Sequence, residues 1–241
     1  MSFAFFDFDN TIIHGDAGPL LGIHMFKRHQ GRIDDRSAGA AKTLRKMATW
    51  TRVTPYLSWM AVQAVLYKAR ARRRSSIVRS AFKGWKGVPV GLLEQTLDGF
   101  VDEEIAPRIY PEVRKEMDAH VAAGRTCVII TTGMERLVAR VLPHLPEGTQ
   151  LIGCRLEERD GRFTGRVQGP LYGADKANII TAYCRAAGVD PADCWAYSDH
   201  YSDHQMLQAV GHGVCVNPAS RLEAMAKEHG WQVLRPADPT K

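Results

Sequence analysis

Short apolar runs, each followed by an amphipathic stretch, dominate the sequence from Pro111 onward. A continuous apolar run of four to eight residues is typical of a buried strand, and apolar residues spaced three or four apart are typical of a helix. Strands that alternate with helices in this way predict a doubly wound, mostly parallel α/β sheet. The predicted strands are 2–8, 126–131, 151–155, 162–167, 194–198, 213–216 and 231–234, and the predicted helices are 112–123, 135–142, 176–187, 203–210 and 221–229.

Residues 18–108 follow a different pattern, with long amphipathic stretches and weak strand signals. Glycines and prolines between residues 84 and 91 indicate turns. This region therefore interrupts the α/β pattern as an inserted, mainly helical cap domain. The catalytic core domain is expected to combine 1–17 with 109–241. The helices predicted in the cap are 33–51, 55–73, 76–85 and 92–104.

Composition changes this picture little, because 45% apolar and 24% charged residues are ordinary for a globular protein. The charge is more informative. The net charge is +6, and five of the seven residues 68–74 are Lys or Arg. One interpretation is a solvated helix end, since cations stabilise the negative end of the helix dipole. The other is peripheral membrane contact through 55–74, an apolar helix followed by cations for anionic headgroups. No nucleic-acid partner is expected.

The five cysteines are scattered and include no CxxC pair. This usage favours buried free thiols in a reducing compartment. No apolar run approaches the roughly 18 residues of a membrane-spanning helix, and no charged leader precedes the first strand. We therefore expect a cytoplasmic protein, as a monomer or a homodimer.

Polar residues follow three predicted strands and begin one predicted helix. In an open α/β sheet, ligands bind at the carboxyl ends of the strands, so the fold is expected to bring these residues together. Asp7 and Asp9 stand two apart and therefore share one face of extended chain. The four fragments are Asp7-Phe8-Asp9-Asn10-Thr11, Thr131-Thr132-Gly133, Lys176 and Asp199-His200-Tyr201-Ser202-Asp203.

The chemistry of these fragments is complementary. Several carboxylates and a phosphate need a cation to share a pocket, and oxygen ligands favour Mg²⁺. Lys176 and the Thr131 hydroxyl would stabilise charge on a phosphoryl group. Asp7 would attack phosphorus to form an aspartyl-phosphate. Asp9 would protonate the leaving alcohol and then activate water.

The ordered set of four fragments resembles the haloacid dehalogenase superfamily, and the resemblance covers nearly the whole chain. The sequence from Ala196 to Leu234 is similar to subfamily IB, the branch that contains the phosphoserine phosphatases. The resemblance implies a Rossmann-like core with a C1 cap and a Mg²⁺-dependent phosphatase. It implies the nucleophile Asp7, the general acid/base Asp9, the phosphoryl-binding residues Thr131 and Lys176, a metal site of Asp7, Asp199 and the main-chain carbonyl of Asp9, and Asp203 behind them. Substrate contacts are expected from Thr11, Asp16, Thr132 and Gly133.

Three other points remain open. Asp7 and Asp9 also suit an Asx turn that ends a strand. His200 and His204 stand four apart, as two zinc ligands on a helix do, although no third nitrogen or thiolate ligand is evident. His14 and Asp16 either touch substrate or cap the next helix.

Three functions follow from the sequence. The first is hydrolysis of a small phosphorylated metabolite, such as an amino-alcohol, amino-acid or polyol phosphate. The second is hydrolysis of a lipid phosphate of the lysophosphatidate or phosphatidylglycerophosphate type at a membrane surface. The third is a binding module without activity. Asp16 stands where phosphoserine phosphatases carry a longer acidic residue, and a cap arginine is hard to place, with Arg79 near the expected region.

Overall fold

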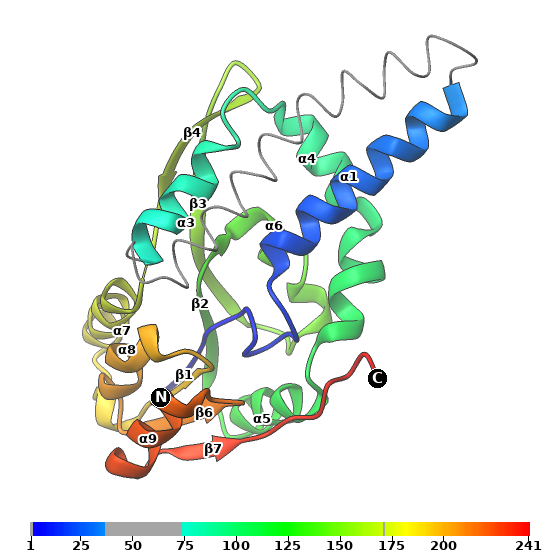
Figure 1. The fold of residues 1–241 in the computed structure, drawn as a ribbon. Coiled ribbons are helices and arrows are strands. Elements are labelled where there is room, and N and C mark those ends of the chain that lie inside the picture. Colours follow the sequence, from blue (N-terminus) through cyan, green and yellow to red (C-terminus); the bar gives the residue numbers. More distant parts are fainter. Residues whose placement is uncertain (1, 37–73, 171) are drawn as a thin grey trace. The chain divides into compact units, whose positions relative to one another are not determined.

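The structure is a computed structural model that describes residues 2–36, 74–170 and 172–241 (Figure 1). The predicted helix 55–73 lies outside the described residues, and so does most of the predicted helix 33–51. The helix α1 (Ala17–Arg36) begins far earlier than the sequence pattern indicated. Its glycines lower helix propensity, and its proline falls in the first turn, where proline is tolerated.

The chain divides into two compact units. Unit 1 comprises Met1–Ala17, Gly99–Arg155 and Gln168–Lys241, and unit 2 comprises Gly18–Asp98 and Leu156–Val167. Both units are therefore built from non-contiguous segments. The division into a catalytic core domain and a cap domain, with boundaries at residues 17 and 108, stays a prediction.

A seven-stranded sheet has the order β4-β3-β2-β1-β5-β6-β7. β1 lies in the middle and pairs in parallel with β2 on one side and β5 on the other. The pairs β2–β3, β5–β6 and β6–β7 are also parallel. The predicted α/β class is confirmed. The strands are β1 (Phe3–Phe6), β2 (Thr126–Met134), β3 (Gln150–Arg159), β4 (Arg162–Gln168), β5 (Trp195–Ser198), β6 (His212–Val216) and β7 (Gln232–Leu234).

Helices follow most of the predicted positions. Gly99 adopts a left-handed conformation with φ of +82° at the end of α4, and a π-helical turn then spans Val101–Ile105. The helix predicted over 92–104 is therefore confirmed as α-helix up to Phe100, and its last residues are π-helical. The α-helices after α1 are α3 (Arg74–Lys83), α4 (Val90–Phe100), α5 (Pro111–Ala122), α6 (Glu135–Ala139), α7 (Gly173–Ala187), α8 (His204–Gln208) and α9 (Ser220–His229).

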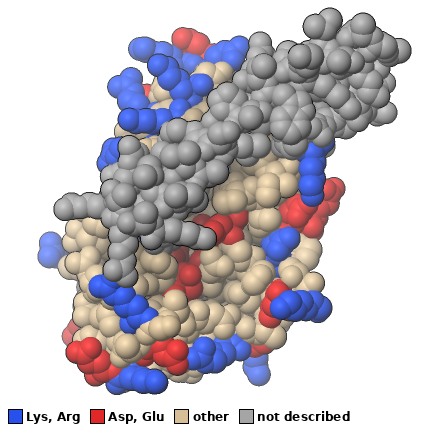
Figure 2. Space-filling model, in the orientation of Figure 1, with Lys and Arg blue, Asp and Glu red and all other residues tan. Residues whose placement is uncertain are grey.

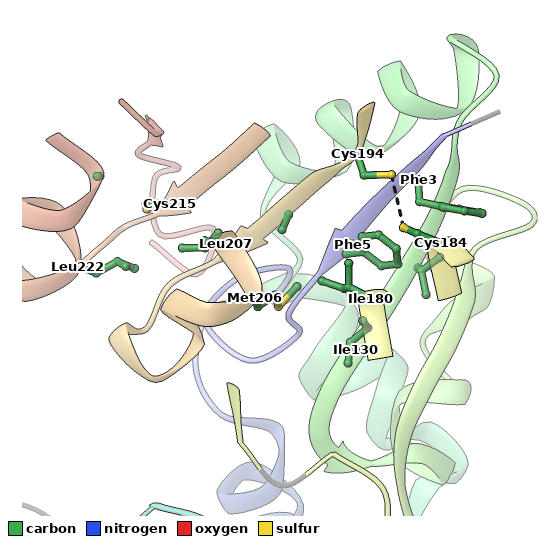
Figure 3. Packing of buried hydrophobic residues seen from close by; sticks show 13 residues of the cluster. Phe3, Phe5, Ile130, Ile180, Cys184, Cys194, Met206, Leu207, Cys215 and Leu222 are labelled. Atoms are coloured by element: carbon green, nitrogen blue, oxygen red, sulfur yellow. Dashed lines mark hydrogen bonds between the residues drawn. The ribbon is translucent and has the colours of Figure 1, made fainter. Parts of the chain in front are cut away.

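The core on one face of the sheet is apolar and rich in cysteine (Figure 3). Phe3 and Phe5 of β1 point into it, as alternate residues of a strand must. Cys184 of α7 and Cys194 before β5 lie against each other, with their sulfur atoms 3.8 Å apart. All five cysteines are buried free thiols, as the sequence predicted. This packing fixes α7 against β1 and β5.

β3 and β4 form the hairpin that the sequence predicted around Asp160-Gly161. Both turn residues are left-handed, with φ of +51° and +69°, which suits the twist of a two-residue hairpin turn. The hairpin leaves the core unit, because Leu156–Val167 belong to unit 2. This second segment of unit 2 was not foreseen from the sequence.

Gly173 is expected to tolerate no side chain. A methyl group at this first residue of α7 would overlap the main-chain oxygen of Ser202. We expect Gly173→Ala to lower the free energy of unfolding by about 2–3 kcal/mol, a usual cost of overpacking. Gly91 in α4 faces open space, so Gly91→Ala is the control and should be neutral or slightly stabilising in urea unfolding. Equal stability of the two variants would contradict this close packing.

Candidate active site

Residues from two strand ends and one helix start meet in unit 1. Asp7 directly follows β1, Asp199 directly follows β5, and Lys176 lies in the first turns of α7. β1 is flanked by β2 and β5, so their carboxyl ends are adjacent. The fold thus explains why fragments distant in sequence assemble at one edge of the sheet.

Lys176 joins two of the predicted carboxylates. Its Nζ lies 2.7 Å from Oδ1 of Asp7 and 2.7 Å from Oδ2 of Asp203. All three side chains are buried, and Lys176 is only 1% exposed. The two carboxylates raise the pKa of Lys176 against the opposing effect of burial, so the ammonium group stays charged. A fixed cation therefore sits in the interior beside Asp7.

Asp203 is held by three donors. Besides Lys176, the hydroxyl of Ser198 donates to its Oδ2 at 3.0 Å, and the hydroxyl of Ser202 donates to its Oδ1 at 3.2 Å. Neither serine was predicted to have a role in the site. Their regular spacing around Asp199 and Asp203 was the available signal. This arrangement fixes the Asp203 carboxylate as the support of Lys176.

Asp7 is oriented by its main chain and its neighbours. Its amide donates to the carbonyl of Tyr197 on β5 at 2.9 Å, and its Oδ1 accepts the amide of Phe8 at 2.7 Å. Burial raises the pKa of Asp7 to about 6, although Lys176 opposes the shift. The amide of Phe8 and the ammonium of Lys176 both bind Oδ1 of Asp7, and neither of these two bonds uses Oδ2.

The loop after β1 is folded back on itself around Asn10. Asn10 is left-handed with φ of +56°, and its Oδ1 accepts the amide of Gly15 at 3.0 Å. Its side-chain amide donates to Oδ1 of Asp16 at 2.9 Å. Asp16 is exposed and is thus held at the surface of the loop. Sequence reasoning left Asn10 without a role, although asparagine is enriched at left-handed positions.

Asp9 begins this loop and caps α1. Its Oδ1 accepts the amide of Ala17 at 2.8 Å, so Asp9, and not His14 or Asp16, makes this bond to the start of the helix. Burial raises the pKa of Asp9 to about 7, against the effect of that hydrogen bond. A carboxyl group with this pKa can donate and accept a proton near neutral pH.

An irregularity in β2 shapes the Thr131 region. Three residues of β2, numbers 131–133, lie opposite the single residue Gly153 of β3. Such a bulge re-aims side chains at a strand end. The Thr131 hydroxyl accepts the amide of Gly133 at 2.9 Å, a bond that does not use its hydrogen. A methyl group on Gly133 would approach both Thr131 Oγ1 and Asp9 Oδ2, at 3.1 and 3.8 Å. Thr131 and Asp9 therefore lie on the same side of Gly133.

The oxygen donors around Asp7 suit a hard cation. The predicted ligands are two side chains, Asp7 and Asp199, and one main-chain carbonyl, that of Asp9. Thr11 is buried, and its hydroxyl donates toward Asp199 at 3.5 Å, so it faces a predicted metal ligand. Burial raises the pKa of the Asp7 carboxyl, as expected for an anion that a divalent cation would stabilise. The donor set thus fits Mg²⁺.

No three His, Cys, Asp or Glu side chains converge as metal ligands within residues 2–36, 74–170 and 172–241. The predicted Mg²⁺ set needs only two side chains, but the zinc alternative needs a third beside His200 and His204. His200 Nδ1 instead accepts the amide of Ser202, and His204 stacks on Tyr201. The zinc alternative therefore has no support.

The membrane interpretation of 55–74 falls almost wholly outside the described residues. Across the part of the chain that is described, no helix is both long and apolar enough to cross a bilayer.

His14 bonds to the Tyr110 hydroxyl at 3.0 Å and approaches Asp238. It thus takes part in contacts within unit 1.

Asp9→Asn is expected to stabilise the metal-free protein at high pH. The folded-state pKa of Asp9, about 7, lies above its ordinary value of 3.8. The stability that Asp9 contributes is therefore complete below about pH 4 and is lost as pH rises through 7. In EDTA, the variant should be more stable than the natural protein at pH 8 by on the order of 2 kcal/mol, and equal near pH 4. Urea unfolding measures both, with Asp193→Asn as the exposed control. A constant difference across this range would contradict the prediction.

Comparison with known proteins places the chain in a family. The family model of haloacid dehalogenase-like hydrolases matches residues 4–208. A phosphoserine phosphatase of Mycobacterium tuberculosis is 31% identical over 95% of this chain and 69% of its own length. A histidinol-phosphatase of Neisseria meningitidis is 34% identical over 56% of this chain and 63% of its own length. A Bordetella pertussis crystal structure of unknown function superposes with a TM-score of 0.72 at 23% identity, covering 97% of both chains.

The structural likeness, at this low identity, shows the fold alone. The family model covers most of the chain, and the relatives support the predicted enzyme class of phosphoric monoester hydrolases. The resemblance that the four sequence fragments indicated is therefore confirmed. The chain belongs to the haloacid dehalogenase-like hydrolases.

Proposed function

We propose that this protein is a Mg²⁺-dependent phosphomonoesterase that forms an aspartyl-phosphate on Asp7. The buried Asp7–Lys176–Asp203 chain, with 2.7 Å between Lys176 and each carboxylate, is the observation that carries the proposal. A buried lysine held by a dedicated carboxylate supplies positive charge where a phosphoryl group would bind. An Asx turn that merely ended a strand would need no such cation, which argues against that alternative.

Asp7 is the proposed nucleophile. The amide of Phe8 and the ammonium of Lys176 orient its carboxylate through Oδ1. Oδ2 would attack phosphorus, and the P–O bond to the leaving alcohol would break. Lys176 and the Thr131 hydroxyl would stabilise the phosphoryl oxygens. Water would then cleave the aspartyl-phosphate and release inorganic phosphate.

Asp9 is the proposed general acid and base. Its pKa of about 7 lets it hold a proton at neutral pH. The amide of Ala17 fixes Oδ1, and Oδ2 lies on the side of Gly133 and Thr131. The protonated carboxyl would donate to the leaving alkoxide, and the resulting carboxylate would accept a proton from the attacking water.

Mg²⁺ would be held by Asp7, Asp199 and the main-chain carbonyl of Asp9. When bound, it would neutralise the carboxylates and the phosphate and would favour their approach. Thr11, which donates toward Asp199, would help to position that ligand. Asp203 would not bind the metal ion itself, but would position Lys176 through their ion pair.

The proposed substrate is a small phosphate ester with an amino group. Relatives named phosphoserine phosphatase and histidinol-phosphatase support this class, as one cleaves an amino-acid phosphate and the other an amino-alcohol phosphate. Asp16 offers an exposed carboxylate, held by Asn10 in the loop that begins with Asp9. This carboxylate would attract an ammonium group on the substrate.

A panel of phosphate esters at fixed Mg²⁺ tests the proposal. Phosphoserine, histidinol phosphate and ethanolamine phosphate carry an amine, and glycerol phosphate does not. We expect release of inorganic phosphate to be faster from the amines, and Asp16→Asn to remove that preference while sparing p-nitrophenyl phosphate. Equal rates with and without an amine would refute the substrate class. Absence of turnover on every ester would refute the enzyme itself.

A further inference from the structure

The sequence contains a long segment that lacks acidic residues. Between Asp35 and Glu94 there is no Asp or Glu, while thirteen residues are Lys or Arg. The rest of the chain then carries 19 Lys and Arg against all 26 Asp and Glu, a net charge of −7. The positive charge of this protein is thus concentrated in one segment, which belongs to unit 2. Such asymmetry indicates an anionic partner for that unit.

The described end of this segment forms a basic surface. Arg79 and Lys83 of α3 and Lys86 in the following turn are exposed. The β3–β4 hairpin adds Arg162, whose guanidinium donates to the carbonyl of Gly87 at 2.7 Å. We call Arg79, Lys83, Lys86 and Arg162 the basic surface. Figure 2 shows Lys and Arg side chains at the top of the view, with fewer Asp and Glu side chains among them.

The hairpin and the turn after α3 form one rigid support for these cations. The amide of Gly87 donates to the carbonyl of Phe163 at 2.8 Å, and the amide of Phe163 donates to the carbonyl of Val88 at 3.0 Å. Trp85 packs edge-to-face on Phe163 with ring centroids 5.9 Å apart. The basic surface is therefore built on paired backbone, and its cations do not depend on a loose loop for their placement.

Apolar side chains are exposed beside the cations. Pro89 pairs with Arg162 through a backbone bridge and is exposed, and Leu92 of α4 is 39% exposed. Cations around exposed apolar groups suit the boundary between headgroups and acyl chains. A single-stranded nucleic acid would instead use aromatic faces for stacking, but Phe163 is buried and Trp85 packs against it.

We propose that the basic surface docks unit 2 on a bilayer of anionic phospholipid. Electrostatic attraction to the headgroups supplies most of the binding, and Pro89 and Leu92 reach into the interface. Each Lys or Arg near an anionic bilayer contributes about 1 kcal/mol, or about fivefold in affinity. Docking depends on none of the catalytic residues, so it stands apart from the proposed reaction.

Vesicle co-sedimentation of the full chain tests the docking. Vesicles of pure phosphatidylcholine are compared with vesicles that contain about a third phosphatidylglycerol, at low and high salt. We expect binding only to the anionic vesicles, with loss at high salt because the attraction is screened. Arg79→Gln/Lys83→Gln/Lys86→Gln should weaken this binding by roughly a hundredfold.

A matched triple variant controls for net charge. Lys115→Gln/Arg185→Gln/Lys227→Gln removes the same three charges from exposed positions of unit 1. It should bind vesicles as the natural protein does. Thermal unfolding, unchanged in both triple variants, shows that each is folded.

Three outcomes would overturn the proposal. One is equal sedimentation with neutral and anionic vesicles. The second is equal loss of binding in the two triple variants. The third is tighter binding to single-stranded DNA than to the vesicles, lost on removal of Arg79, Lys83 and Lys86, which would assign the surface to nucleic acid.

Discussion

Asp7→Asn is expected to abolish phosphate release, by at least about 10³-fold. The amide is nearly the same size as the carboxylate but cannot attack phosphorus to form an acyl phosphate. Lys176 still has Asp203 at 2.7 Å, so the variant should fold. The measurement is turnover of p-nitrophenyl phosphate at saturating Mg²⁺, with thermal unfolding as the check on structure.

Asp193→Asn, at an exposed position outside the four motifs, is the matched control and should keep full activity. Rapid quenching with the natural protein and a labelled ester should also trap phosphate on the chain, and Asp7→Asn should trap none. An Asp7→Asn protein with more than a tenth of the natural rate would rule out the covalent route. It would leave the phosphatase class intact if Asp9→Asn still lost activity.

Lys176→Met is expected to damage both activity and stability. It leaves the buried carboxylates of Asp7 and Asp203 without the cation that lies between them. Removing one partner of a buried ion pair costs about 3–5 kcal/mol, because the charge that remains is uncompensated. Activity should fall by on the order of 10³-fold, since the phosphoryl oxygens lose a charged donor.

The pH dependence separates this explanation from a packing defect. Without Lys176, the pKa of Asp7 rises further above about 6, so the folded state binds a proton more tightly than the unfolded chain. The destabilisation should therefore be largest at pH 8 and shrink toward pH 5, where the carboxyl is protonated. Adding Asp203→Asn to Lys176→Met should recover part of the loss. A deficit that is constant with pH and insensitive to Asp203→Asn would point to lost packing.

The sheet was largely predictable because its strands are unusually apolar. Phe3–Phe6 are all buried, and an uninterrupted apolar run has no other stable place than a central strand. The hairpin at Asp160-Gly161 was also predictable, since both residues accept the left-handed backbone that the turn requires. In both places local sequence and global fold favour the same structure.

The segments 17–36 and 74–105 were less predictable because tertiary packing overrides weak local signals there. α1 forms despite three glycines and a proline, and α4 ends at Phe100, one residue after the left-handed Gly99, where a continuous α-helix was expected. The assignment of Leu156–Val167 to unit 2 depends on contacts with the turn after α3, which no local pattern records.

The site shows the same division. The catalytic carboxylates and Lys176 stand in ordered motifs, so their convergence could be predicted. The supporting bonds could not, because they join groups whose types are common everywhere in proteins. Ser198 and Ser202 hold Asp203, and Asn10 holds the loop that carries Asp16. Only the three-dimensional structure identifies these as supports.

Unit 2 consists of two separate segments, Gly18–Asp98 and Leu156–Val167. This division limits how unit 2 can be exchanged between related proteins. A chimera made by splicing the long segment alone would leave the recipient's own hairpin facing a foreign turn. The backbone hydrogen bond between Gly87 and Phe163 would then have to form between residues of two different proteins. Transplants should carry both segments, with four junctions, and laboratory evolution of the donor should diversify the two together.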